Sequence, residues 1–443
     1  MKRLTVDEIR AALPDVDELR PLMDHVLMHS EADPAREWAG SGELASAGDR
    51  IASASTLRNT VDAVAAAEHV HLAELFRRVA DAVFRLETGD HAAAAEALLS
   101  AAALEEARDR PATAAEYADK ALEIARNDSR SDLVARALRR RARGRWNAGD
   151  YGSAEQDYAA AYDMASGVSD ARGAAEAAVG AGNVLEEQGA WDQAEAWYRA
   201  ALQALGPVDV PAPERWHALL NLHVTLRSRG AIEESLVPLA EAEGEAARLG
   251  DASSRPFLEN ARGQLCMATG ETSDALAHFG EALSAATGAR ASVTIRLNLA
   301  EALLAAGRGV DAGEQARRAE QEALIAGLPR KIPEVYRLLG RIMARAGNPD
   351  AFVLFERALD IIRERRLSPL ERALTLQGYA EAERLVGSAE VADELTARAD
   401  ELYARLGIRH RRSEWADRHA ADESDEDNES DEDNEDNRRG PPS

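Results

Sequence analysis

Small and hydrophobic residues recur along most of the chain at the spacing of a helix face, between stretches of polar residues. In one well-defined segment, Ala194, Tyr198 and Ala201 follow one another at intervals of four and three residues, which places them on one stripe of an α-helix. Gly189, before this helix, has the backbone freedom for a left-handed turn, and Gly182 is small enough to let another helix approach. The segment therefore predicts two antiparallel helices joined by a tight turn.

The same helix pair recurs along the chain. Its turns are separated by 37 to 41 residues, and a regular period between about 20 and 50 residues indicates a solenoid of stacked units. The predicted turns lie at Asp109, Gly149, Gly189, Gly230, Gly270, Gly307, Gly347 and Gly387. No stretch alternates between polar and apolar residues as a β-strand does. The sequence therefore predicts an all-α fold, a right-handed α-solenoid of about eight antiparallel helix pairs.

The array resembles the tetratricopeptide repeat (TPR) family. The small–aromatic–small signature is carried by residues such as Gly182, Ala194, Tyr198 and Ala201, and the resemblance covers roughly residues 92–407. The period is near 40 residues, whereas about 34 is usual for the family, so each helix is expected to be about one turn longer, near 18 residues. Long repeats of this kind resemble those of kinesin light chains and of the arrays in some bacterial regulators.

The sequence divides into five parts. Residues 1–55 predict a short helical region with a flexible connector, and 56–91 a leading helix that caps the array. The solenoid is expected over 92–407, followed by a C-terminal capping helix over 408–421. The last segment, 422–443, carries eleven acidic residues and no hydrophobic one, so a disordered acidic tail is expected.

Composition narrows the functional classes. A net charge of −26 makes the protein as a whole a poor binder of nucleic acid or of an anionic membrane. No apolar run approaches the length of a membrane span and no signal peptide is visible, so a cytoplasmic location is expected. Of the 53 basic residues only three are lysines, a bias that fits a high-GC genome and a salt-rich cytosol equally well.

The sequence offers no convincing catalytic, metal or cofactor site. It contains no Gly-rich phosphate loop, nucleophile elbow or zinc-protease motif. His25 and His29 lie four residues apart on a predicted helix, but no further ligand has a matching spacing. Cys266, the single cysteine, excludes a disulfide framework and a cysteine-based zinc site. We therefore expect neither an enzyme nor a bound cofactor or metal.

The first helices of successive pairs are expected to line the concave side of the solenoid. Their inward positions carry asparagines and two rows of arginines, and the candidate groove residues are Arg139, Arg143, Asn183, Asn221, Asn260, Asn298, Arg337 and Arg341. An asparagine amide both donates to and accepts from an extended peptide backbone. The family resemblance implies this role. The arginines either bind an acidic partner or pair with glutamates of adjacent helices.

These features predict a scaffold or adaptor that binds a peptide or helix of another protein in its groove, without nucleic acid or membrane. The alternative is a sensory array in which a peptide or small ligand changes the superhelix. The tail over 422–443 has three interpretations: a solubilising segment, a site for a basic partner, or an intramolecular contact with the arginine rows.

Overall fold

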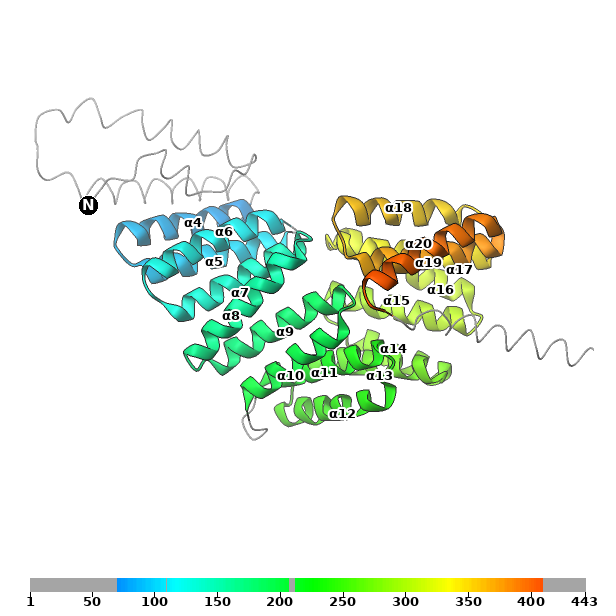
Figure 1. The fold of residues 1–443 in the computed structure, drawn as a ribbon, viewed down its shortest axis with the longest axis horizontal. Helices are drawn as coiled ribbons and strands as arrows, with labels where there is room; N and C mark the ends of the chain where they lie inside the picture. Colours follow the sequence, from blue (N-terminus) through cyan, green and yellow to red (C-terminus); the bar gives the residue numbers. More distant parts are fainter. Residues whose placement is uncertain (1–69, 109, 207–211, 409–443) are drawn as a thin grey trace, which may run out of the picture.

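The computed structural model describes residues 70–108, 110–206 and 212–408 (Figure 1). The predicted N-terminal region (1–55), most of the second capping helix and the acidic tail (422–443) lie outside these residues. The proposed contact of the tail with the arginines stays a prediction for the same reason.

The described residues form helices and contain no strand, as the sequence predicts. After α4 (Val70–Glu87), eight antiparallel pairs follow in chain order. They are α5 (His91–Ala107) with α6 (Pro111–Asn127), α7 (Ser131–Asn147) with α8 (Tyr151–Gly167), α9 (Ala171–Glu187) with α10 (Trp191–Leu205), α11 (Pro213–Ser228) with α12 (Ile232–Leu249), α13 (Arg255–Thr269) with α14 (Thr272–Ala285), α15 (Ala289–Ala305) with α16 (Gly309–Ile325), α17 (Ile332–Arg345) with α18 (Ala351–Glu364), and α19 (Pro369–Val386) with α20 (Ala389–Arg405). Short 3₁₀ turns, η1 (Ala252–Ser254) and η2 (Pro329–Lys331), precede α13 and α17.

The turns within the described residues fall where the sequence places them, whereas the predicted turn at Asp109 lies outside these residues. Gly149 and Gly189 have φ values of 81° and 77°, in the left-handed region that glycine adopts without strain. Asp150 follows Gly149, and its side chain accepts a hydrogen bond from the backbone N–H of Ser153 at 3.2 Å, which caps α8. The helices contain between 14 residues, in α14, and 18 residues, in α12. Only the longest helices therefore reach the predicted length of about 18 residues.

Several pairs are held by a small residue of one helix that faces an aromatic ring of the other. Ala194, Tyr198 and Ala201 on α10 are fully buried, and the Tyr198 ring lies against Gly182 on α9. A Cβ atom on Gly182 would come within 2.5 Å of this ring, so no larger residue fits. Gly263 on α13 meets the ring of Phe279 on α14 in the same way. The predicted role of Gly182 in close helix approach is confirmed.

The pairs follow one another around a superhelix that brings late repeats back to early ones (Figure 1). Arg330 in η2 donates to the backbone carbonyl of Asn147 at 3.0 Å and to the Tyr151 hydroxyl at 3.2 Å, and its guanidinium pairs with Glu187. Glu187 also accepts hydrogen bonds from the Trp146 indole at 2.6 Å and from Tyr151 at 2.8 Å. We call this group the clasp. It joins residues up to 184 positions apart in the sequence.

Apolar contacts accompany the clasp. Trp191 at the start of α10 packs against a buried cluster formed by α19, α20 and Ile408, which follows α20, and Leu370 of α19 packs against the same cluster. The backbone of the turn at Gly189 lies directly against the Ile408 side chain. Early turns of the array therefore form part of the core that buries the last helix pair.

The glycine–aromatic packing predicts opposite effects for two similar substitutions. Gly263→Ala should destabilise the fold by about 1–3 kcal/mol, because its Cβ would overlap the buried Phe279 ring. Gly244→Ala in α12 should instead stabilise by up to about 1 kcal/mol, because no atom lies within 4 Å of the new Cβ and alanine favours the helix. Urea unfolding of the two variants measures both effects. Equal effects would contradict this packing account.

The clasp predicts that Arg330→Ala opens the superhelix. The substitution removes the guanidinium that bridges Glu187, Tyr151 and the end of α7, at a cost of about 1–3 kcal/mol. Small-angle scattering should then give a larger radius of gyration than for the unchanged protein. Arg363→Ala is the control, because Arg363 is exposed and pairs with Asp360 in its own helix. An unchanged scattering curve for Arg330→Ala would show that the clasp does not hold the early and late repeats together.

Candidate binding surface

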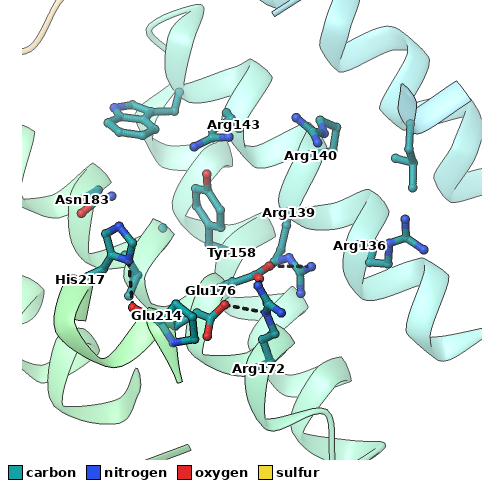
Figure 2. Close-up of a pocket in the computed structure, with 15 residues that line it drawn as sticks. Arg136, Arg139, Arg140, Arg143, Tyr158, Arg172, Glu176, Asn183, Glu214 and His217 are labelled. Carbon is teal, nitrogen blue, oxygen red and sulfur yellow. Dashed lines mark hydrogen bonds and ion pairs between the residues drawn. The ribbon is translucent and has the colours of Figure 1, made fainter. Parts of the chain in front are cut away.

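The first helices of the early pairs surround a cavity of about 480 Å³, which we call the basic cavity (Figure 2). Its walls come from α5, α7, α9 and α11, with Tyr158 contributed by α8. The residues that face it include Arg136, Arg139, Arg140, Arg143, Trp146, Tyr158, Arg172, Glu176, Asn183, Glu214 and His217. Three of the predicted groove residues, Arg139, Arg143 and Asn183, are therefore brought together here.

Most of the arginines in this cavity bridge adjacent helices. On α7, Arg139 pairs with Glu176 of α9 at 3.0 Å and also donates to the Gly173 carbonyl at 3.0 Å. Arg140 on the same helix donates to Glu106 of α5 at 2.7 Å. For these two side chains the structure shows pairing between adjacent helices, one of the two roles that the sequence leaves open.

Arg143 differs from its neighbours. Its side chain is exposed, and no hydrogen bond or ion pair joins it to another residue in the described part of the chain. In Figure 2 its guanidinium lies beside the hydroxyl end of Tyr158. The basic cavity therefore has an available cation at one defined place.

A second cavity of about 690 Å³, the central cavity, lies where early and late repeats meet. Its lining combines α5, α7 and α9 with α15, η2, α17 and α19, and includes Glu106, Glu187, Arg290, Arg330, Lys331, Glu334, Ser368 and Glu371. Arg143, Trp146 and Asn183 line both cavities. These three residues therefore stand between the basic cavity and the central cavity.

The asparagines form hydrogen-bonded pairs between successive first helices. Asn221 donates from Nδ2 to Oδ1 of Asn183 at 2.9 Å, and Asn298 donates to Oδ1 of Asn260 at 2.8 Å. The Tyr198 hydroxyl lies 2.7 Å from the same oxygen of Asn183. All four asparagines are partly exposed. The sequence places them correctly on the first helices, but it does not reveal their pairing.

This pairing leaves a regular set of free groups. In the described part of the chain, nothing hydrogen bonds to Nδ2 of Asn183 or Asn260, or to Oδ1 of Asn221 or Asn298. Asn183 and Asn260 therefore keep a free NH2 group, which only donates, and Asn221 and Asn298 keep a free carbonyl acceptor beside their second N–H. A peptide backbone likewise presents both N–H donors and carbonyl acceptors.

The C-terminal arginine row follows the bridging pattern. Arg337 on α17 pairs with Glu371 on α19, and Arg341 pairs with Glu301 on α15 at 3.0 Å and with Glu381 at 3.6 Å. Neither arginine lines the basic or the central cavity. Within the structure, this row links three successive first helices.

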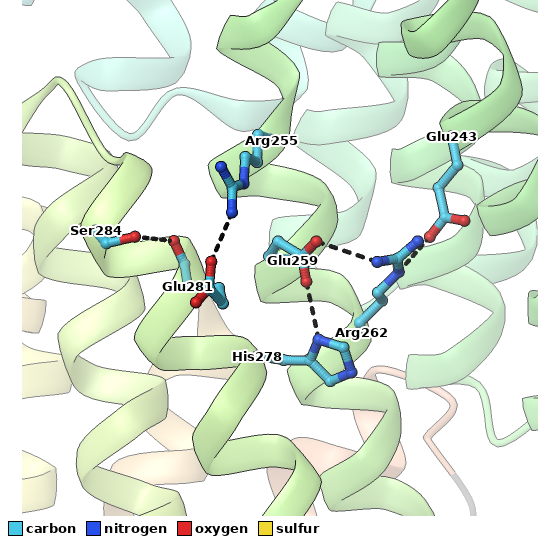
Figure 3. Close-up of polar contacts among 7 residues, drawn as sticks. All are labelled: Glu243, Arg255, Glu259, Arg262, His278, Glu281 and Ser284. Carbon is cyan, nitrogen blue, oxygen red and sulfur yellow. Dashed lines mark hydrogen bonds and ion pairs between the residues drawn. The ribbon is translucent and has the colours of Figure 1, made fainter.

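A further polar cluster crosses the middle of the array (Figure 3). Arg262 donates to Glu243 at 2.6 Å and to Glu259 at 3.1 Å, and Glu259 also contacts His278 at 2.8 Å. These bonds join α12, α13 and α14, and each carboxylate already has a cationic partner. Among the described residues, no group of three or more histidine, cysteine or acidic side chains is arranged to hold a metal.

The repeat pattern does not predict the clasp. Trp146, Tyr151 and Glu187 lie on early repeats, and Arg330 lies 143 residues after Glu187. The repeat period predicts contacts between neighbouring repeats, and it does not predict contacts between repeats that are so far apart in the sequence. The one available signal was the departure at Pro329-Arg330-Lys331, where a short 3₁₀ turn interrupts the helix pairs.

No protein-family model and no curated protein matches this chain. Solved structures do match it. A Rap protein complexed with competence and sporulation factor aligns with a TM-score of 0.57 and 13% sequence identity, over 88% of this chain and 99% of that chain. The apo form of RapI aligns with a TM-score of 0.48 and 12% identity, over 61% of this chain and 98% of that one. A tetratricopeptide repeat protein from Parabacteroides merdae gives 0.39 and 16%, over 69% and 98%.

The first alignment covers nearly the whole of both chains, and the helix pairs agree with it. This chain has a TPR-like solenoid fold. At these identities the likeness shows the fold of the TPR-like solenoid and nothing about its ligand. Among the helices that the structure describes, none combines the length and the apolar character of a membrane span.

The hydrogen bonds of the Tyr198 hydroxyl in the TPR-like solenoid depend on whether Glu186 is protonated. The Tyr198 hydroxyl lies 2.7 Å from Asn183 and 2.9 Å from Glu186, but a phenol carries a single proton to donate. Both bonds form when Glu186 is protonated and donates to Tyr198, which then donates to Asn183. Burial raises the pKa of Glu186 to about 7, which favours this protonated form.

The raised pKa predicts a pH-dependent stability. Between the ordinary carboxyl pKa of 4.5 and the folded value of about 7, the folded state binds more protons than the unfolded state. Stability from this group is therefore present below pH 4.5 and is lost as the pH rises through 7. Between pH 5 and 8, the unchanged protein should lose about 1–3 kcal/mol of unfolding free energy relative to Glu186→Gln, as measured by denaturant unfolding. Parallel pH profiles for the two proteins would contradict this assignment.

Proposed function

We propose that the TPR-like solenoid is an interaction scaffold whose inner surface binds an extended segment of a partner protein. The observation that carries this proposal is the set of free amide groups on successive first helices: donors on Asn183 and Asn260, and acceptors on Asn221 and Asn298. A peptide backbone presents the complementary groups whatever its side chains are. The proposed role is binding rather than catalysis, and it needs no cofactor.

The two cavities support an extended ligand rather than a folded domain. They share Arg143, Trp146 and Asn183 and together border the inner surface from α5 to α19. The clasp spans the superhelix beside the central cavity. A narrow peptide segment fits such a surface without separating the early repeats from the late ones. The Rap protein of similar fold was solved with competence and sporulation factor bound, which is consistent with a binding role for this fold.

A sensory role is the second candidate, and the clasp favours it. Asn183 and Glu187 are four residues apart on α9 and therefore face the same side of that helix. Trp146 lines both cavities and also donates to Glu187. A ligand that contacts Asn183 and Trp146 would act directly on the contact that joins early and late repeats.

The scaffold proposal predicts that Asn221→Ala with Asn298→Ala weakens peptide binding by about fivefold to a hundredfold. The double change removes two free acceptors from the inner surface, each contributing about 0.5–1.5 kcal/mol. A displayed library of random peptides is panned against the full chain, and the affinity of selected peptides is then measured by calorimetry.

Asn127→Ala is the matched control, because Asn127 is exposed at the end of the second helix α6. It should leave binding unchanged. Thermal unfolding of each variant checks that the fold is kept. If the double variant binds every selected peptide as tightly as the unchanged protein, the asparagines do not form the binding surface.

A further inference from the structure

The basic cavity is positively charged on a strongly acidic protein. Five arginines line it against two glutamates, Glu176 and Glu214, while the chain carries a net charge of −26. Four of these arginines already pair with carboxylates of the protein, because Arg136, Arg139, Arg140 and Arg172 each have a glutamate partner. The excess charge of the cavity is therefore concentrated on the fifth.

Arg143 is this fifth arginine, and its surroundings suit an anion. It has no hydrogen-bond or ion-pair partner in the described part of the chain, and it borders both cavities with Trp146. The aromatic side chains of Trp146 and Tyr158 line the same cavity, and the Arg143 side chain is exposed. A guanidinium binds a carboxylate through two parallel, charge-assisted hydrogen bonds.

A hydrogen-bond acceptor without a partner lies close to this cation. Glu106 uses Oε2 to accept from Arg140 at 2.7 Å, whereas its buried Oε1 has no hydrogen-bond partner within the protein. The Glu106 side chain is only 10% exposed and lines the central cavity. Burial raises the pKa of Glu106, and the charges of Arg140 and Arg143 lower it in part. Because Oε1 is buried, Glu106 contributes negative charge beside Arg143 and no direct contact with a ligand.

We propose that Arg143 selects the ligand: its exposed guanidinium, which borders both cavities, binds a carboxylate of the partner segment. This inference rests on the proposed function and adds the chemical class of the ligand. The preferred segment carries an aspartate or glutamate at one fixed position. The asparagines contribute affinity for any peptide backbone, and Arg143 distinguishes one sequence from another.

The experiment uses the same displayed peptide library with the unchanged protein, Arg143→Met and Arg136→Met. The unchanged protein should enrich peptides with an acidic residue at one position. Arg143→Met should still enrich peptides but without that preference, because methionine keeps much of the side-chain volume and loses the charge. Arg136→Met is the control and should keep the preference, because Arg136 is already paired with Glu96 and does not line the central cavity.

A double-mutant cycle then tests the contact itself. In one selected peptide the acidic residue is replaced by its amide. This replacement should weaken binding to the unchanged protein by about tenfold to a hundredfold, and binding to Arg143→Met by less than about threefold. A free and an amidated C-terminus of the same peptide show whether a terminal carboxylate serves in place of the side chain. Arg143→Glu should reverse the preference towards lysine and arginine.

The outcomes separate this inference from the proposed function. Enriched peptides without an acidic preference, or the same preference in Arg143→Met, would overturn the role of Arg143 and leave the scaffold role standing. A library from which the unchanged protein enriches nothing would overturn both. Thermal unfolding excludes misfolding as the cause, and the exposed position of Arg143 makes a large loss of stability unexpected.

Discussion

The contact between an aromatic ring of one helix and a glycine of its partner determines much of this structure. Because Gly182 has no side chain, the Tyr198 ring lies directly on α9 and its hydroxyl passes the backbone to reach Asn183. That bond, together with the one from Asn221, occupies Oδ1 of Asn183 and leaves Nδ2 free on the inner surface. The packing of the pair thus orients a candidate binding group. Larger residues at 182 would change both the spacing of the helices and the surface they present.

Most polar side chains of the inner surface serve the protein itself. Arg139, Arg140, Arg337 and Arg341 bridge successive first helices, and the asparagines pair in the same direction. A surface of this kind resists sideways slippage of the repeats because each bridge crosses an interface. The few groups left unpaired then have disproportionate importance for recognition.

Local features of the array were readable from the sequence, whereas distant contacts were not. The positions of Gly189, Ala194 and Tyr198 fix helix, turn and packing face, because these depend on residues within one or two repeats. The asparagines were placed on the correct helices for the same reason. The pairing of the arginines needs the rotation between neighbouring units, which periodicity does not give. The partners of Arg330 depend on the rotation between repeats, summed over several repeats. A small error in each predicted rotation would place Arg330 far from these partners.

The clasp changes how the array is expected to melt. In an open solenoid the stability is a sum over nearest neighbours, so terminal repeats fray and unfolding proceeds along the chain. Here Arg330 and Ile408 contact the early repeats around Tyr151 and Gly189, which makes the array closer to a closed loop of units than to a line. Loss of one early repeat then withdraws support from a late one. Such closure converts an additive, gradual transition into one that is more nearly all-or-none over the described repeats.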